Sequence, residues 1–347
     1  METVWFCLVA IMVAVYILLD GFDLGAGAIH LLVAKTKEEK RQVIASIGPV
    51  WDGNEVWLIA AGGTLFFAFP VLYASSFSGF YLPLMIVLWL LILRGASVEF
   101  RNHIESNVWI PLWDFLFCAS SLLLAVFYGA ALGNVVRGVP LDESGYFFEP
   151  LWTNWRLGEQ TGILDWYTVL VGVLALLSLM MHGALWVRMK TTGAVNERAG
   201  RLANEAWWAV TVLTILVTAI TFAVLPLLRT NFSRGPWGFI FPILSIAGLL
   251  GVQFELRRRN ERKAFLASCM YLAGMLTSVV FSVYPMVLPA RDGVHSLTVN
   301  NAKAGAYGLK VGFVWWIIGM ILVAGYFRYV YSSSAGKVAP ETDQAQK

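Results

Sequence analysis

The chain has 347 residues, of which 58% are hydrophobic and only 14% are charged. An average soluble domain carries about 25% charged residues, so this composition excludes a water-soluble globular protein. The net charge is only +3, and the Lys and Arg residues stand in short clusters between apolar runs. That pattern is typical of membrane topology and not of nucleic-acid binding. The sequence therefore predicts an all-α polytopic membrane protein that is embedded in lipid.

Nine segments are long and apolar enough to cross a membrane, since a spanning helix needs about 20 mainly apolar residues. Their approximate ranges are 4–33, 48–73, 77–98, 111–134, 164–187, 203–228, 237–256, 264–288 and 308–331. They form a single membrane domain over residues 1–333, and a polar cytoplasmic tail follows at 334–347. We expect two four-helix bundles and a peripheral ninth helix. Only Ala74, Ser75 and Ser76 separate the second helix from the third, which predicts a tight hairpin.

The basic residues predict the orientation of these helices. The first, third, fifth and seventh loops hold 14 Lys and Arg residues, whereas the even-numbered loops hold 6. Cytoplasmic loops carry the excess of basic residues. We therefore expect the N-terminus outside the cell and the C-terminus in the cytoplasm. Arg291, in the last outer loop, is expected to be solvated or paired with lipid headgroups.

The first helix carries ionisable residues that lipid would not tolerate. Asp20, Asp23 and His30 are spaced i, i+3 and i+10, with Gly27 between them, so they share one helical face. Each charged side chain in the bilayer costs roughly 2.5 to 3.5 kcal/mol, so this face must meet protein. Gly21 and Gly25 form a small-xxx-small pair that lets another helix come close. We expect the face with Asp20, Asp23 and Gly27 to contact a partner subunit. His30 itself is expected at the cytoplasmic interface.

The second helix opens with two more acids, Asp52 and Glu55, which lie on one face near the positive end of the helix dipole. At 1.5 Å per residue, Asp52 and Glu55 lie about 6 to 10 Å from the cytoplasmic side, and Asp23 and Asp20 about 15 and 20 Å. Arg94 on the third helix could pair with any of them. Two interpretations remain open. The acids form either a proton path from the cytoplasm or a buried ion network that fixes helix packing.

Metal binding in this chain is weakly indicated. The three cysteines lie in apolar segments without metal-ligand spacing, so no metal site is expected from them. His182, near the cytoplasmic end of the fifth helix, is a weak candidate for a haem ligand, because a single membrane histidine is more often a hydrogen-bonded structural residue.

Several blocks of the first 140 residues resemble subunit II of the cytochrome bd quinol oxidases. The two most specific blocks are Asp20-Gly-Phe-Asp-Leu-Gly-Ala-Gly27 and Gly48-Pro-Val-Trp-Asp-Gly-Asn-Glu-Val-Trp-Leu58. The resemblance continues through Phe69-Pro-Val-Leu-Tyr73, Phe77-Ser-Gly-Phe-Tyr81, Arg94-Gly-Ala-Ser-Val-Glu-Phe-Arg101, Trp113-Asp114 and Tyr128-Gly-Ala-Ala-Leu-Gly-Asn-Val-Val-Arg-Gly-Val-Pro140. Beyond these blocks, only helix count and length follow the family.

This resemblance implies one half of a respiratory terminal oxidase in a bacterial inner membrane. Such an oxidase oxidises quinol, reduces O₂ to water with protons from the cytoplasm, and does not pump protons. The resemblance places haem b and haem d in subunit I, the expected partner, to which small single-helix subunits can be added. Some family members hold a quinone in subunit II as a structural element. Acids matching Asp23 and Asp52 are thought to line a proton route at the subunit interface, and Trp51 and Trp57 are expected to pack there.

Two functions of other classes compete with this interpretation. One is a secondary transporter whose midplane acids couple solute movement to protons. The other is a structural assembly partner in which the acids only fix helix packing.

Overall fold

The computed structural model describes residues 1–158, 161–225 and 228–338 and is almost entirely helical. The helices are α1 (Glu2–Val33), α2 (Lys37–Ile47), α3 (Trp51–Ala68), α4 (Pro70–Gly79), α5 (Tyr81–Phe100), α6 (Trp109–Arg137), α7 (Trp166–Lys190), α8 (Gly193–Val224), α9 (Arg229–Arg234), α10 (Ile240–Arg257), α11 (Glu261–Val283) and α12 (Ala306–Ser333). A short 3₁₀ helix, η2 (Pro236–Phe239), precedes α10, and two short antiparallel strands, β1 (Met286–Leu288) and β2 (Leu297–Thr298), follow α11.

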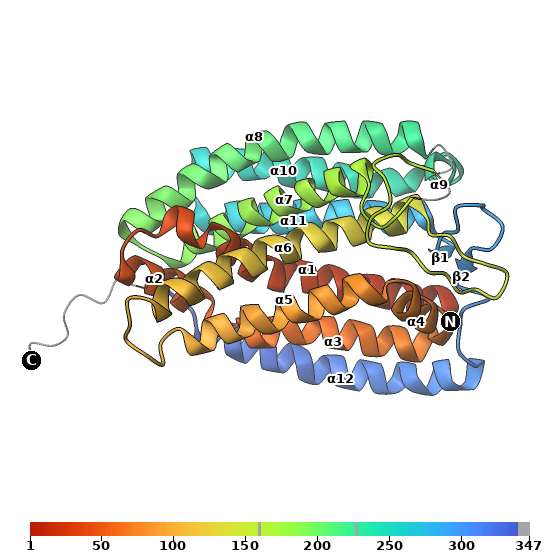
Figure 1. Cartoon of the computed structure of the whole chain (residues 1–347), viewed down its shortest axis with the longest axis horizontal. Coiled ribbons are helices and arrows are strands. Elements are labelled where there is room, and N and C mark those ends of the chain that lie inside the picture. Colours follow the sequence, from red (N-terminus) through yellow and green to blue (C-terminus); the bar gives the residue numbers. More distant parts are fainter. Residues whose placement is uncertain (159–160, 226–227, 339–347) are drawn as a thin grey trace, which may run out of the picture.

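The long helices lie side by side in a single bundle (Figure 1). Within the described residues, eight of them are long and apolar enough to cross a membrane, and α3 with α4 fills the ninth position. The predicted all-α membrane fold is therefore confirmed. α1, α3, α5 and α6 contact one another, as do α7, α8, α10 and α11. However, α7 also packs extensively on α1 and α6, so the two groups of four form one continuous core.

The last helix, α12, is peripheral, as predicted. Only 6% of its most apolar stretch is buried inside the chain, against 61% for α7. Its contacts run mainly to α3 and α1, where Phe327 lies beside Trp57 and the Trp316 indole donates to the Met12 sulfur. Most of the α12 surface is therefore free to face lipid or another chain.

The predicted hairpin at Ala74, Ser75 and Ser76 is wrong, because these residues lie inside α4. The chain breaks earlier, at Phe69, whose φ of −134° and ψ of 65° are not helical. Pro70 explains the break, since a proline has no N–H to donate and disfavours the helical conformation of the residue before it. The chain then turns at Phe80, between α4 and α5.

Three other boundaries differ from the sequence prediction. α8 begins ten residues early, at Gly193, and ends at Val224, while 226–227 lie outside the described residues. α11 ends at Val283, and β1 occupies the last part of the predicted 264–288 helix. The expected polar tail is in part ordered, because the Val338 N–H donates to the Lys190 carbonyl at 2.6 Å. Residues 339–347 lie outside the described part of the chain.

The first predicted loop contains a helix, α2, that helps to close one end of the bundle. Thr36 caps its start and forms a capping box with Glu39, whose side chain accepts from the Thr36 N–H. Val43 and Ile47 on its apolar face are buried in the main core. Because α2 occupies this end, α3 begins deeper in the bundle than α1 ends. The polar amide of Asn54, in the first turn of α3, reaches the level of Leu19 and Asp23.

The central packing of the bundle depends on glycines of α1 and α7. A Cβ on Gly25 would overlap the backbone oxygen of Leu179, and a Cβ on Gly183 would overlap the backbone of Gly25. A Cβ on Gly27 would meet the Ser121 side chain of α6. The close approach expected around Gly25 is thus present, but the neighbours are helices of the same chain. The expectation that this face of α1 contacts a partner subunit is wrong.

This packing predicts that Gly25→Ala destabilises the protein strongly. The added methyl group meets backbone atoms, which cannot rotate away, so we expect a loss of about 2 kcal/mol or more. Thermal unfolding of the detergent-solubilised protein measures this loss. Gly319→Ala on α12 is the matched control, since a Cβ there meets nothing within 4 Å. Equal melting temperatures for the two variants would contradict the proposed packing.

Candidate functional site

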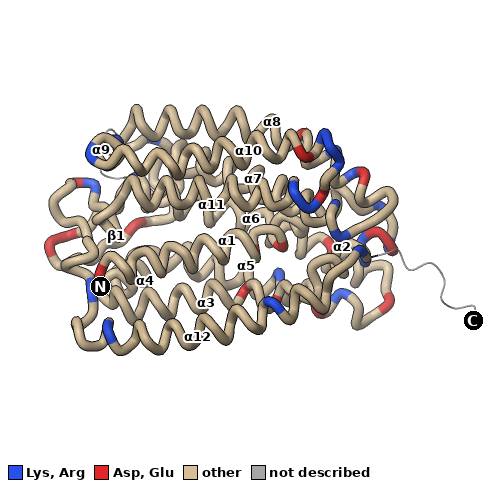
Figure 2. The backbone as a smooth tube through the Cα atoms, turned by 180° about the vertical axis from the view of Figure 1, so that it is seen from behind, with Lys and Arg blue, Asp and Glu red and all other residues tan. Residues whose placement is uncertain are grey.

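The buried charges of the bundle gather around Arg94 of α5. Its guanidinium donates to the Asp20 carboxylate at 2.6 Å and to the Glu55 carboxylate at 2.9 Å. Arg94 and Asp20 are fully enclosed, whereas the Glu55 side chain is 24% exposed. One cation therefore joins acids from α1 and α3 in the interior of the bundle, away from the basic residues that Figure 2 shows mostly at the α2 end.

Asp23 lies next to this ion network, but within the described residues it forms no ion pair. The Asn54 amide donates to one Asp23 carboxylate oxygen at 2.7 Å, and Tyr331 of α12 donates to the Asn54 carbonyl oxygen at 2.8 Å. The other Asp23 oxygen, Oδ1, is buried without a hydrogen-bond partner among the described residues. Tyr331 thereby fixes the amide so that its NH₂ group faces Asp23. Sequence reasoning missed Asn54 and Tyr331, although Asn54 lies between the two acids that it singled out.

Asp52 does not join the cluster. Its side chain is exposed on the outer face of α3, one helical turn from Glu55. Glu55 lies level with Asp20, because both bind Arg94. The acids are thus not spread in depth as predicted. Asp20, Asp23 and Glu55 form one group inside the bundle, and Asp52 lies on the surface of α3 beside this group. Trp51 packs on Gly95 of α5, and Trp57 is buried against α12, so both serve contacts within this chain.

A second buried cluster lies nearer the α2 end and was not predicted. The Asp114 carboxylate of α6 accepts from Arg101 at 2.5 Å and bonds the His30 Nε2 at 3.0 Å, while the Lys40 ammonium lies 3.1 Å from its second oxygen. His30 is fully buried inside the chain, whereas the sequence predicted a position at the cytoplasmic interface. Its position seven residues after Asp23, on the same face of α1, was the available signal.

His182, the weak candidate for a haem ligand, has no free ring nitrogen. The His182 Nε2 donates to the Leu18 carbonyl at 3.0 Å, and its Nδ1 lies 2.7 Å from the Ser268 hydroxyl, so neither nitrogen is free for iron. His182 is therefore a structural residue. His295 pairs with Asp292 in a loop, and this hydrogen bond raises the pKa of His295. No group of three or more His, Cys, Asp or Glu side chains suited to a metal occurs in the described residues.

The opposite end of the bundle is closed by a third ion network. Arg137 of α6 binds Asp165, the N-terminal cap of α7, and Glu149 at 2.8 Å. Arg291 from the loop after β1 binds the same Glu149 oxygen. The expectation that Arg291 is solvated is wrong, because it connects this loop to the loop between α6 and α7. We assign this network to stability, since its acids and bases are paired with one another.

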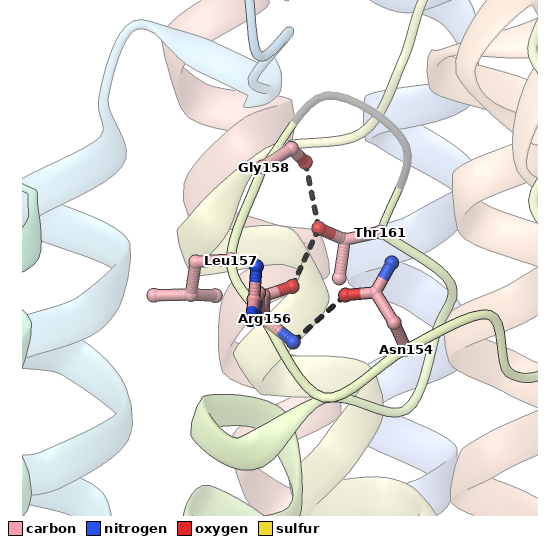
Figure 3. A pocket seen from close by; sticks show the side chains of 5 residues that line it. All are labelled: Asn154, Arg156, Leu157, Gly158 and Thr161. Carbon is pink, nitrogen blue, oxygen red and sulfur yellow. Dashed lines mark hydrogen bonds between the residues drawn. The ribbon is translucent and has the colours of Figure 1, made fainter.

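A surface hollow in the loop between α6 and α7 contains no buried ion pair like those described above. It measures about 410 Å³ and is lined by Asn154, Arg156, Leu157, Gly158 and Thr161 (Figure 3). Thr161 donates to the Gly158 carbonyl at 2.7 Å, and the Arg156 N–H donates to the Asn154 side chain at 2.8 Å. These hydrogen bonds hold the loop in its conformation.

Comparisons with known proteins identify the family and agree with the fold. Residues 1–334 match the family model described as cytochrome bd terminal oxidase subunit II. A probable cytochrome oxidase subunit 2 of Haemophilus influenzae is 30% identical over 96% of this chain and 94% of its own. The cytochrome bd ubiquinol oxidase subunit 2 of Bacillus subtilis is 29% identical over 90% of this chain and 89% of its own. The cytochrome bd-I ubiquinol oxidase subunit 2 of Escherichia coli is 27% identical over 97% of this chain and 95% of its own.

A solved structure shares the fold. The bd oxidase from Geobacillus thermodenitrificans contains a chain that matches 95% of this chain and 97% of its own length, with a TM-score of 0.74 and 17% identity. At this identity the match concerns the fold alone. Together with the whole-length family match, these relatives show that the chain belongs to the cytochrome bd terminal oxidase subunit II family, whose members are subunits of an oxidoreductase complex.

Proposed function

We propose that this chain binds the haem-bearing subunit I of a bd-type quinol oxidase and delivers cytoplasmic protons toward the site of O₂ reduction. In this proposal quinol and O₂ are substrates of the complex, and haem b and haem d belong to subunit I. That division agrees with His182, whose two ring nitrogens are both hydrogen-bonded within the chain. The observation that carries the proton role is Asp23, a buried carboxyl group that lies outside the ion pairs of Arg94.

The charges around Arg94 explain why Asp23 is the group suited to carry a proton. Asp20 and Glu55 are both hydrogen-bonded to the guanidinium, so protonating either would break an ion pair. Among the described residues, Asp23 is hydrogen-bonded only to the neutral amide of Asn54. An isolated buried carboxylate is expensive, and protonation removes that cost. Asp23 can thus gain and lose a proton while the ion pairs of Arg94 keep the neighbouring helices in place.

The outer face of α3 is the surface that we assign to subunit I. Asp52, Val56, Ile59, Gly63 and Phe66 are exposed there at helical spacing. A carboxylate on a membrane-facing surface needs protein or water beside it. Gly63 has open space around its Cα, which would let a partner helix come close. α12 and α5 flank this face through contacts at Gly53 and Gly95.

The proposed location is a bacterial cytoplasmic membrane, with the α2 end on the cytoplasmic side and the N-terminus outside. Most Lys and Arg residues stand at the α2 end (Figure 2). The positive-inside rule favours this orientation, which gives protons of the cytoplasm the shorter way to Asp23. Small single-helix subunits and a structural quinone, both suggested by the family, would add to this assembly without changing the proton role.

The alternatives differ in what they predict. Family membership favours the oxidase subunit over a transporter. In a purely structural partner, Asp23 would only hold Asn54 and α3 in place.

The proton role predicts that Asp23→Asn slows O₂ reduction by the assembled complex. The amide keeps the size of the side chain but cannot exchange a proton, and we expect a loss of at least about tenfold. Quinol-dependent O₂ uptake measures it, and haem content measures assembly. Glu143→Gln, an exposed loop acid, is the control. Normal turnover of an assembled Asp23→Asn complex would leave only the structural role.

The assignment of the α3 face predicts that Gly63→Trp prevents docking of subunit I. The indole would occupy the open space at Gly63, so we expect little haem to co-purify with this variant. Ile215→Trp, on the 68% exposed position of α8, is the matched control and should keep its haem. If Gly63→Trp kept its haem and Ile215→Trp lost it, the partner would dock on the α8 side instead.

A further inference from the structure

The connection between α10 and α11 carries five basic residues within seven positions. We call this group the basic turn; it consists of Arg257, Arg258, Arg259, Arg262 and Lys263, and all five side chains are exposed. None of them forms an ion pair with an acid of the described residues. The acid of the same segment, Glu261, already lies 2.5 Å from the Lys337 ammonium and 3.8 Å from the Arg188 guanidinium. Five positive charges thus remain available to bind an anion.

Membrane topology alone does not account for this group. The positive-inside rule explains an excess of Lys and Arg at the α2 end of the bundle. Other basic residues at this end, however, reach acids of the chain. The Lys40 ammonium lies 3.1 Å from the Asp114 carboxylate, and the Arg198 guanidinium lies 2.5 Å from Glu39. The basic turn differs from these residues in having no acidic partner within the described part of the chain.

The backbone at Arg259 points in the same direction. Its φ of 57° lies in the left-handed region, and at this position after a helix glycine is the usual residue. The helix itself ends normally, because the Arg259 N–H donates to the Leu256 carbonyl at 3.1 Å and the Asn260 N–H to the Glu255 carbonyl at 3.0 Å. Glycine would form the same hydrogen bonds without a strained Cβ. Folding therefore gives no reason for an arginine here.

Arg262 and Lys263 are also placed against the preference of a helix. Both lie in the first turn of α11, at the positive end of the helix dipole, where cations are unfavourable. An anion bound at this end would be attracted by the dipole and would screen the neighbouring cations from one another. Residues that break local rules without a gain in folding are expected where a protein binds something.

The surface beside the basic turn indicates which anion fits. Ile243, Ile246, Leu250 and Phe254 follow one face of α10 at helical spacing, and each is more than half exposed. The Arg258 guanidinium lies 4.0 Å from the centre of the Phe254 ring, so a cation stands at the end of this apolar face. α10 lies across the bundle from α3 and α12 (Figure 1). A phospholipid, with a charged phosphate and acyl chains, matches both parts of this surface.

We propose that the basic turn binds the headgroup of an anionic phospholipid, whose acyl chains lie along the exposed face of α10. In the proposed orientation this lipid belongs to the cytoplasmic leaflet. Its phosphate relieves the repulsion among the five cations and thereby stabilises the α10–α11 hairpin. The inference does not depend on the proton role of Asp23, and it concerns a surface away from the α3 face.

The first test measures lipid binding by the assembled complex in a neutral detergent. The complex is titrated with dioleoylphosphatidylglycerol, and native mass spectrometry counts the bound molecules. A double variant, Arg258→Gln with Arg262→Gln, should weaken binding about 25-fold, since each basic residue near a membrane surface contributes about fivefold. The matched control is Arg229→Gln with Arg234→Gln, which removes the same charge from exposed residues at the other end and also includes an arginine over a ring, that of Phe222. The control should bind as tightly as the wild type.

The second test uses the strained backbone. Arg259→Gly removes one cation and places the favoured residue at a positive φ. Without added lipid, this variant should melt at a higher temperature than the wild-type complex. With dioleoylphosphatidylglycerol, its melting temperature should rise less than that of the wild type. A rise equal to that of the wild type would show that Arg259 does not contact the lipid and would contradict the proposal.

The remaining outcomes of the titration are equally decisive. Arg258→Lys with Arg262→Lys keeps the charges and should retain binding. Equal loss in the two glutamine double variants would show that binding follows net charge alone, and it would overturn the site. Equal affinity of the wild type for dioleoylphosphatidylcholine would exclude an anionic headgroup as the ligand. Displacement of the lipid by inorganic phosphate would show a site for a free anion and would overturn the role of the α10 face.

Discussion

Arg94 is the residue on which the arrangement of the buried charges depends. A bilayer offers no water to solvate a carboxylate, so Asp20 and Glu55 are stable inside the bundle only because one guanidinium binds both. That shared cation joins α1, α3 and α5. Because the Arg94 guanidinium is bound to Asp20 and Glu55, Asp23 has the neutral Asn54 amide as its hydrogen-bond donor. In the proposed function, stability and proton chemistry are thus divided between neighbouring carboxyl groups.

Close packing of α1 makes this division possible. Gly25 and Gly183 bring the α1 and α7 backbones together, and Gly27 makes room for Ser121 of α6. Because α1 is surrounded by α3, α6, α7 and α11, its acids are shielded from lipid by the chain itself. A partner subunit is not needed to cover them. This leaves α3, with Asp52 and Gly63 on its outer side, as the surface where another protein can meet the cluster.

The sequence predicted what depends on local patterning. Helix number followed from apolar length, and the protein-facing side of α1 followed from the spacing of Asp20 and Asp23. It could not predict contacts that join distant segments. Asn54 receives its hydrogen bond from Tyr331, 277 residues away, and His30 meets Asp114 across 84 residues. The depth of the acids was wrong for a related reason. A polar loop was expected at residues 34–47, whereas α2 folds there, and α3 begins deeper in the bundle.

The central claim is that Asp23 holds the exchangeable proton of the cluster while Asp20 and Glu55 stay paired with Arg94. Infrared difference spectroscopy of the complex during reduction measures it most directly, because a protonated carboxyl group has a C=O band that shifts in D₂O. We predict one such band in the wild-type complex that is absent in Asp23→Asn and unchanged in Asp52→Asn. A band that persists in Asp23→Asn would place the proton on another acid and would contradict this account.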